Sequence, residues 1–219
     1  MNPKLGDRSF RLLADLARNN TKEWYHAHKG DIEGQLLAPF ADILEAISVG
    51  LAGREIPFHG GRETMFRMNR DIRFSADKSP YKTNVSGLLT TSATKETCEG
   101  CVYLQLDAGG GFAAFGRYGL DAKSLGPIRD RIVAEPEQFG AILTQLRRGG
   151  FDLFREDRLK TMPRGYAGQA DYAFAEELRL TNLLVRQELP KGVWTSGDVI
   201  VRVADAAAAC RWLMEFVSV

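Results

Sequence analysis

The chain has 219 residues, of which 44% are hydrophobic and 26% charged, the balance of an ordinary soluble globular protein. Its 29 basic residues against 28 acidic ones leave a net charge of +1, which excludes a histone-like or tail-type nucleic-acid binder. The composition also excludes collagen-like, disordered and membrane-spanning classes, and the length favours one domain over residues 1–219.

The N-terminal residues and the cysteines indicate a compartment. Met1 to Leu13 alternate charged residues with short apolar pairs and contain no apolar core of signal-peptide length. No stretch approaches the roughly 18 uninterrupted apolar residues that a membrane span needs. Three cysteines, an odd number, suit a reducing environment. We therefore expect a cytoplasmic protein with no membrane partner.

The first part of the chain has helical patterns. Residues 8–18 predict a short helix, and Asn20 followed by Glu23 has the spacing of a capping box that begins a second one. An apolar stripe with helical spacing follows. It consists of Trp24, His28, Ile32, Leu36, Ile43, Ile47 and Leu51. Pro39 is expected to kink or divide this long segment, because proline cannot continue a regular helix.

The middle of the chain has strand patterns. Residues 65–74 alternate between apolar and polar, and residues 83–91 are rich in β-branched and small side chains. Residues 75–81, between them, supply turn chemistry through serine, aspartate and proline. Two more strands are expected at 102–106 and 112–118, joined through three consecutive glycines.

The remaining patterns decide the fold class. The further predicted elements are helices at 122–133 and 136–148 and strands at 183–189 and 199–203. Asp205 is expected to cap a final helix that runs through Phe216. Because helices and strands come in blocks rather than in regular alternation, the sequence predicts an α+β fold. We expect a mainly antiparallel central sheet covered by the long N-terminal helices.

Residues 62–84 carry the most informative pattern. They hold six basic against three acidic side chains, a local charge of +3. On a strand, one face would hold Phe66, Met68, Ile72 and Phe74, and the other Arg67, Asn69, Asp71 and Arg73. Arg70 would then fall among the apolar side chains, where it needs a carboxylate or carbonyl partner, or a β-bulge that turns it outward.

Three interpretations of residues 62–84 remain open. The first is a pre-organised site for a small phosphorylated or carboxylated ligand, because guanidinium groups match phosphate and carboxylate oxygens and lysines add point charge. Its predicted anion donors are Arg67, Arg70, Arg73, Lys78 and Lys82, oriented by Asp71 and Asp77, with Tyr81 as a hydroxyl donor. The second is a nucleic-acid or protein interaction through the same basic face, and the third a purely architectural network of Arg and Asp. The residues indicate no reaction.

A second basic segment lies at residues 147–164, again with six basic against three acidic side chains. The two segments together leave a charge of −5 for the rest of the chain, so the near-neutral total hides a segregated distribution. We expect Lys160 and Arg164 to converge on the cations of the first segment around one anion pocket. The alternative is two separate solvated faces.

Signals for a metal or a cofactor are weak. Cys98 and Cys101 have the spacing of half a zinc site or of a redox pair. No second cysteine pair exists to complete a zinc site, and redox pairs begin a helix after a strand, whereas this pair precedes a predicted strand. His26 and His28 diverge by roughly 200° on a helix, so they do not chelate one metal together. The sequence has no P-loop, dinucleotide fingerprint or nucleophile elbow. We therefore expect no metal and no cofactor.

Three segments are similar to one known family, catalogued as domain of unknown function 2461. They are Phe10–Trp24, Phe66–Asn84 and Leu159–Tyr166, and the likeness spans about Ser9 to Phe216. One departure is at Gly116–Asp121, where the family tends to carry a glycine-rich strand that ends just before a proline. The resemblance implies a compact cytosolic α/β-type domain of unassigned activity. Both basic segments coincide with its motifs.

Overall fold

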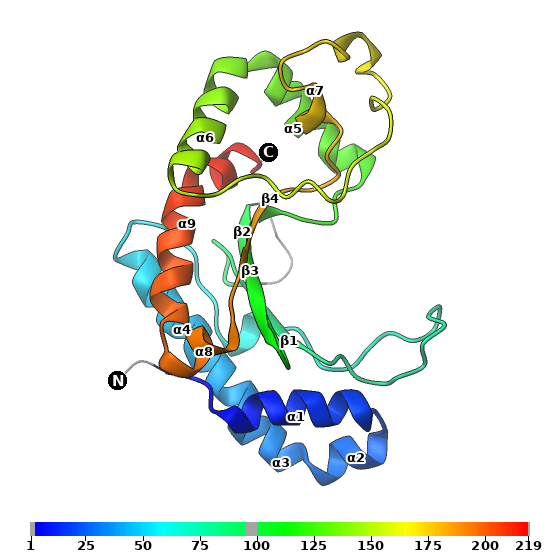
Figure 1. Cartoon of the computed structure of the whole chain (residues 1–219), viewed down its shortest axis with the longest axis vertical. Helices are drawn as coiled ribbons and strands as arrows, with labels where there is room; N and C mark the ends of the chain where they lie inside the picture. The colour runs from blue at the N-terminus through cyan, green and yellow to red at the C-terminus, as the bar shows by residue number, and fades with distance from the viewer. Residues whose placement is uncertain (1–2, 95–99, 219) are drawn as a thin grey trace. The chain divides into compact units, whose positions relative to one another are not determined.

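The computed structural model describes residues 3–94 and 100–218 (Figure 1). Within these residues the chain has an α+β fold, as predicted, with a four-stranded antiparallel sheet in the order β1–β2–β3–β4. The strands are β1 (Val85–Leu89), β2 (Cys101–Asp107), β3 (Gly110–Arg117) and β4 (Leu183–Glu188). Cys98 lies outside the described residues, so the prediction about the Cys98–Cys101 pair falls outside them too.

Helices precede and follow the strands. They are α1 (Asp7–Arg18), α2 (Lys22–Ala27), α3 (Lys29–Ile32), α4 (Ala38–Ala52), α5 (Ala122–Ala134), α6 (Pro136–Arg148), α7 (Ala175–Leu178), α8 (Lys191–Ser196) and α9 (Val199–Phe216). Short π or 3-10 turns lie at Glu33–Leu37, Arg62–Thr64 and Ala167–Gln169. The predicted helices at 8–18, 122–133 and 136–148 and the predicted strands at 83–91, 102–106, 112–118 and 183–189 are confirmed.

The chain forms two compact units, each built from several segments. Unit 1 comprises Met1–Thr97, Val102–Ala113 and Gln187–Ala208, and unit 2 comprises Cys98–Cys101, Ala114–Arg186 and Ala209–Val219. The boundary between the units therefore falls within β2, β3, β4 and α9. The prediction of one domain over residues 1–219 stays a prediction.

Pro39 lies at the second residue of α4, and the chain stays helical from Lys29 to Ala52 around it. A proline has no N–H to donate and crowds the carbonyl four residues earlier, which here belongs to Gln35. The chain widens into the π turn Glu33–Leu37 before α4 begins at Ala38. The buried Ser9 hydroxyl of α1 donates to the Gln35 carbonyl at 2.6 Å. A side chain of α1 thus satisfies the acceptor that Pro39 leaves open.

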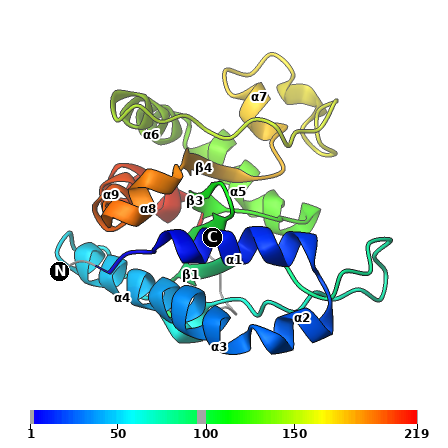
Figure 2. The ribbon, with the colours of Figure 1, turned by 60° about the horizontal axis from the view of Figure 1, so that its bottom comes forward.

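The N-terminal helices gather beside β1, as Figures 1 and 2 show. At Gly87 of β1 an added Cβ would lie 2.6 Å from Leu44 Cδ1, so glycine permits α4 to approach the sheet closely. The buried residues of Lys29–Ala52 are Ile32, Leu36, Phe40, Ala41, Ile43, Leu44, Ile47 and Leu51. The helical stretch Lys29–Ala52 is long and apolar enough to cross a membrane, but a core helix of a soluble protein can have the same length and composition.

Two local predictions near the chain ends are wrong. Thr21 rather than Asn20 caps α2, since its Oγ1 accepts the Trp24 N–H at 3.2 Å. Residues 199–203 begin helix α9 instead of forming a strand, so Asp205 lies inside that helix, where it pairs with Arg54. Burial of the β-branched side chains at the start of α9, followed by an alanine-rich run, outweighs their strand propensity.

Candidate functional site

Residues 66–84, which we call the motif arm, form an extended excursion from unit 1 (Figure 1). The predicted strand at 65–74 is wrong, because a single isolated bridge, Asn69 to Tyr81, joins the two sides of the arm in place of a continuous ladder. Side chains satisfy the backbone near its tip, where Asp71 Oδ1 accepts the Arg73 N–H at 3.2 Å. Such local bonds compete with strand pairing.

The apolar side chains of the motif arm do not share one buried face. Met68 is buried and Phe66 half-buried, whereas Phe74 at the tip is 96% exposed. The predicted apolar face is therefore wrong at Phe74. A reversal of the chain near Phe74 turns its ring to solvent.

Two of the predicted anion donors are paired within the arm. Arg70 forms an ion pair with Asp77, and Arg73 binds both carboxylate oxygens of Asp71, with Nη2 at 2.6 Å and Nε at 3.0 Å. Hydrogen bonds from Ser79 and then from Arg70 hold the pKa of Asp77 well below its usual range, and those from Arg73 lower the pKa of Asp71. Arg70 thus has the carboxylate partner that its position required.

The other cations of the arm have no carboxylate partner among the described residues. Lys78 Nζ donates to the Ile72 carbonyl at 3.0 Å. Within residues 3–94 and 100–218, the side chains of Arg67 and Lys82 form no ion pair, and Lys82 Nζ lies 5.3 Å from the centre of the Phe66 ring. Burial and then the charge of Arg67 lower the pKa of Lys82.

Tyr81 anchors the arm to the N-terminal helices. Its backbone N–H donates to Asn20 Oδ1 at 3.0 Å, and its carbonyl accepts from Asn20 Nδ2 at 2.9 Å. Its ring stacks on Tyr25 with 3.9 Å between centroids. Tyr81 is only 5% exposed, so this contact fixes the base of the arm.

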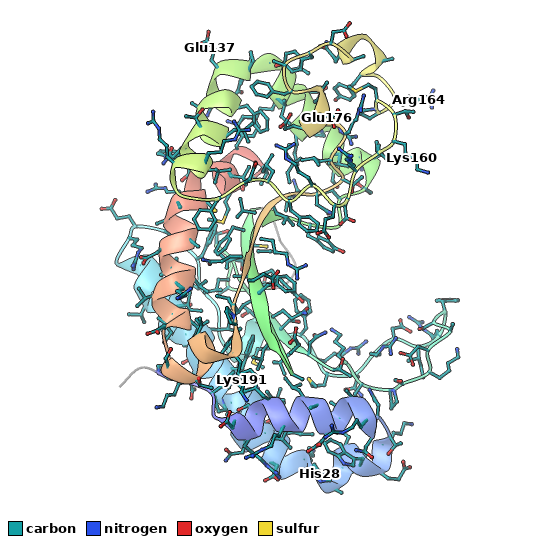
Figure 3. All side chains as sticks on the ribbon, viewed as in Figure 1. His28, Glu137, Lys160, Arg164, Glu176 and Lys191 are labelled. Atoms are coloured by element: carbon teal, nitrogen blue, oxygen red, sulfur yellow. The ribbon has the colours of Figure 1, made fainter. Side chains whose placement is uncertain are left out.

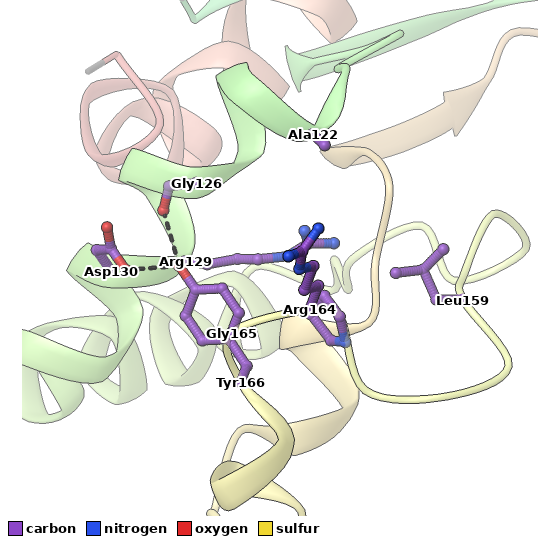
Figure 4. Close-up of a pocket in the computed structure, with 9 residues that line it drawn as sticks. Ala122, Gly126, Arg129, Asp130, Leu159, Arg164, Gly165 and Tyr166 are labelled. Atoms are coloured by element: carbon purple, nitrogen blue, oxygen red, sulfur yellow. Dashed lines mark hydrogen bonds between the residues drawn. The ribbon is translucent and has the colours of Figure 1, made fainter.

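Part of the second basic segment lines a pocket of about 450 Å³ in unit 2 (Figure 4). The pocket lies between α5 and residues 159–166. Its lining residues are Ala122, Gly126, Arg129, Asp130, Leu159, Pro163, Arg164, Gly165 and Tyr166. The predicted donor Arg164 is among them. Lys160 extends from the same loop and is exposed, but it is not part of the lining (Figure 3).

Arg129 is the pocket residue that sequence reasoning missed. It is 4% exposed, and its Nε and Nη2 donate to the carbonyls of Leu178 at 2.8 Å and Leu180 at 3.1 Å. No carboxylate of the described chain pairs with it. Its position offered a signal, because it lies four residues after Leu125 on the apolar stripe of α5. Burial lowers the pKa of Arg129, but a guanidinium keeps its charge in proteins.

Tyr166 closes one side of the pocket. Its hydroxyl donates to Asp130 Oδ1 at 2.5 Å, and the Gly126 carbonyl lies at 3.2 Å. Burial and then the bond to Asp130 raise the pKa of Tyr166 to about 12. The phenol is therefore neutral near pH 7 and its ring is held in place. This bond uses Oδ1 of the Asp130 carboxylate.

A match to a family model confirms the resemblance carried by the three segments. The model described as a conserved hypothetical protein (DUF2461) matches residues 8–216. The chain belongs to the DUF2461 family. The matched residues include both the Asn20–Tyr81 anchor and the pocket of unit 2. No curated protein matches the chain.

In this DUF2461 chain the second basic segment, like the motif arm, has some basic side chains in ion pairs and others outside them. Arg155 pairs with the buried Glu177 at 2.9 Å, and Arg158 pairs with Glu176 at 3.2 Å. Arg164 forms no ion pair with a described residue. Since the motif arm belongs to unit 1 and Arg164 to unit 2, the predicted convergence of the two segments on one pocket stays a prediction.

The described residues of this DUF2461 chain hold no cluster of three or more His, Cys, Asp or Glu side chains placed to bind a metal. His28 instead stacks on Trp24 with 4.0 Å between ring centroids, and its Nδ1 lies 2.8 Å from the Trp24 carbonyl. We assign no metal site to these residues.

Proposed function

We propose that the pocket of unit 2 binds a small phosphorylated or carboxylated ligand through Arg129 and Arg164. The observation that carries this proposal is the buried guanidinium of Arg129, which has no carboxylate partner in the described part of the chain, beside Arg164, which forms no ion pair there either. A buried charge is costly unless it is paired. A bound anion would supply the missing charge, and guanidinium groups bind phosphate and carboxylate in bidentate geometry.

An architectural role for Arg129 accounts for only part of its bonding capacity. Its two bonds join α5 to the carbonyls at the end of α7 and just beyond it. A guanidinium has five N–H donors, so three of them have no partner within the described residues, and Arg129 is one of the residues that line the pocket. The lining residues include no serine, cysteine or histidine that would act as a nucleophile. The proposal is therefore binding without an assigned reaction.

Inorganic phosphate tests the proposal directly. We expect it to bind the full chain with a Kd of about 1 mM, the affinity of a small ligand held by a few charge-assisted bonds. Arg164→Gln should weaken this binding at least about tenfold, because it removes a charged donor. Isothermal titration calorimetry at physiological ionic strength measures both values.

Arg147→Gln is the matched control for Arg164→Gln. It removes an exposed cation of the same basic segment that lies at the end of α6 and does not line the pocket. Its Kd should stay within about twofold of the parent protein, since charges that are exposed and distant are screened by salt. Two results would contradict the proposal. One is an equal loss of phosphate affinity in both variants, and the other is the absence of binding by the parent protein at a phosphate concentration of about 10 times the expected Kd.

The motif arm supports a second candidate function, an interaction with nucleic acid. The observation that favours it is Phe74, which is 96% exposed and has the Arg73 guanidinium 5.9 Å from its ring centre. An exposed aromatic ring among cations suits base stacking and phosphate contact. A protein partner is the alternative.

Phe74→Ser tests this second candidate. Stacking of one base contributes about 1–3 kcal/mol, so the variant should bind a single-stranded oligonucleotide at least about fivefold more weakly. Fluorescence anisotropy with a labelled oligothymidine measures this affinity. Val49→Ser removes another exposed apolar side chain of unit 1 and should leave it unchanged. Identical oligonucleotide affinities in the parent protein, Phe74→Ser and Val49→Ser would contradict a role of the motif arm in binding nucleic acid.

A further inference from the structure

We infer that the pocket of unit 2 selects a phosphate monoester, with two negative charges, whose organic part presents a flat apolar face to the pocket wall. This inference rests on the proposed function and names the ligand class of the same site. It depends on two features of the pocket, the separation of its charges and the chemistry of its wall.

The charges of the pocket are separated in space. Figure 4 shows the Asp130 carboxylate at the Tyr166 hydroxyl, on the far side from the guanidinium groups of Arg129 and Arg164. Asp130 is the one carboxylate among the lining residues. The end of the pocket that holds Arg129 and Arg164 therefore has two positive charges and no negative one.

Two positive charges favour a doubly charged anion. A phosphate monoester carries about two negative charges above its second pKa, which is near 6. A sulfate ester or a carboxylate carries one. Because Arg129 is 4% exposed, water screens its attraction to a ligand less than it would at the surface. The second charge of the ligand therefore contributes strongly to affinity.

The wall of the pocket suits an apolar and flat body. Leu159 is 38% exposed, Pro163 is buried, and the bond to Asp130 holds the Tyr166 ring in one orientation. A Cβ added to Gly126 would meet nothing within 4 Å, so the facing side of α5 leaves space. An organic group attached to the phosphate can lie against these side chains and bury apolar surface.

Three probes separate charge from shape, namely phenyl phosphate, phenyl sulfate and inorganic phosphate. At pH 8 we expect phenyl phosphate to bind at least about tenfold more tightly than phenyl sulfate, which has the same shape and one charge fewer. It should also bind about three- to tenfold more tightly than inorganic phosphate, because the ring buries apolar surface. Calorimetric titration of the unmodified full chain gives all three affinities.

Leu159→Ser tests the wall. It should remove most of the advantage of phenyl phosphate over inorganic phosphate and leave the affinity for inorganic phosphate unchanged. Val201→Ser, which removes an exposed apolar side chain of α9 outside the pocket, is its control. Lowering the pH from 8 to 5 should weaken phenyl phosphate binding toward that of phenyl sulfate, because the ligand gains a proton with a pKa near 6. No histidine lines the pocket to titrate in this range.

The results distinguish a failure of the inferred ligand class from a failure of the proposed anion binding. Equal affinity for phenyl phosphate and phenyl sulfate would overturn the preference for two charges and leave anion binding standing. Equal affinity for phenyl phosphate and inorganic phosphate would overturn the apolar wall. If none of the three probes binds, the proposed function itself fails. These comparisons use the unmodified protein, so they do not depend on the folding of any variant.

Discussion

Replacing Arg129 with methionine is expected to abolish phosphate binding in the pocket of unit 2 and to lower the free energy of unfolding by about 2–3 kcal/mol. Methionine has a similar length, but it cannot donate to the carbonyls of Leu178 and Leu180. Two charge-assisted bonds are lost and two acceptors lose their donors. The cost of burying the guanidinium disappears as well, which keeps the net loss moderate.

The affinity for phosphate should fall at least about 100-fold in Arg129→Met, because the deepest donors of the pocket are gone. Urea unfolding and calorimetry measure the two effects separately. Arg129→Lys keeps the charge, but one ammonium group cannot serve both carbonyls and an anion, so an intermediate affinity is expected. Lys123→Met removes a cation of α5 outside the pocket and should change neither quantity.

The combination of results for Arg129 decides its role. A variant that is destabilised but binds phosphate like the parent protein would make Arg129 a purely architectural residue that joins α5 to residues 178–180. Loss of binding in Arg129→Met with partial recovery in Arg129→Lys supports the proposed anion site.

Replacing Asn20 with alanine is expected to lower the free energy of unfolding by about 2–4 kcal/mol and to loosen the motif arm. The Asn20 side chain bonds to both the N–H and the carbonyl of Tyr81. Because Tyr81 is buried, both of its backbone groups would lose partners where water does not easily replace them. Helix α2 should persist, since Thr21 is its cap.

Urea unfolding gives the stability of Asn20→Ala, and amide hydrogen exchange at residues 80–82 reports the loosening of the arm. Asn20→Asp keeps the acceptor and loses the donor, so an intermediate loss is expected. The neighbouring Asn19 is a matched control, because within the described residues its exposed side chain bonds only to the Asp15 carbonyl, at 3.0 Å. Asn19→Ala should cost about 0.5 kcal/mol, as an exposed hydrogen bond does. Equal stability and equal exchange in both variants would remove the anchoring role of Asn20.

Much of the fold follows from local signals in the sequence. The helices over α1, α5 and α6 have clear periodicity, and the π turn just before Pro39 follows from the chemistry of proline. The glycines before the predicted strand at 112–118 also act locally. At Gly111, with φ of 148°, an added Cβ would lie 2.0 Å from the Gln105 carbonyl oxygen, so only glycine fits this hairpin.

The motif arm was predictable only in part. Its turn at 75–81 and the need of Arg70 for a partner followed from residue chemistry, and Asp77 supplies that partner. Alternation alone predicted a strand at 65–74, but Asp71 and Asp77 satisfy backbone groups near the tip and turn the chain out of a ladder. Alternation gives no information about such local competition.

The sequence by itself determined the α+β class, most elements, the family and the two basic segments, because each depends on neighbouring residues or on a pattern along the chain. Only the tertiary structure decided which cations stay unpaired, that Asn20 holds Tyr81 from 61 residues away, and that Arg129 reaches Leu178 across 49 residues to line a pocket with Arg164. Partners so distant in sequence are selected by packing, which no local pattern encodes.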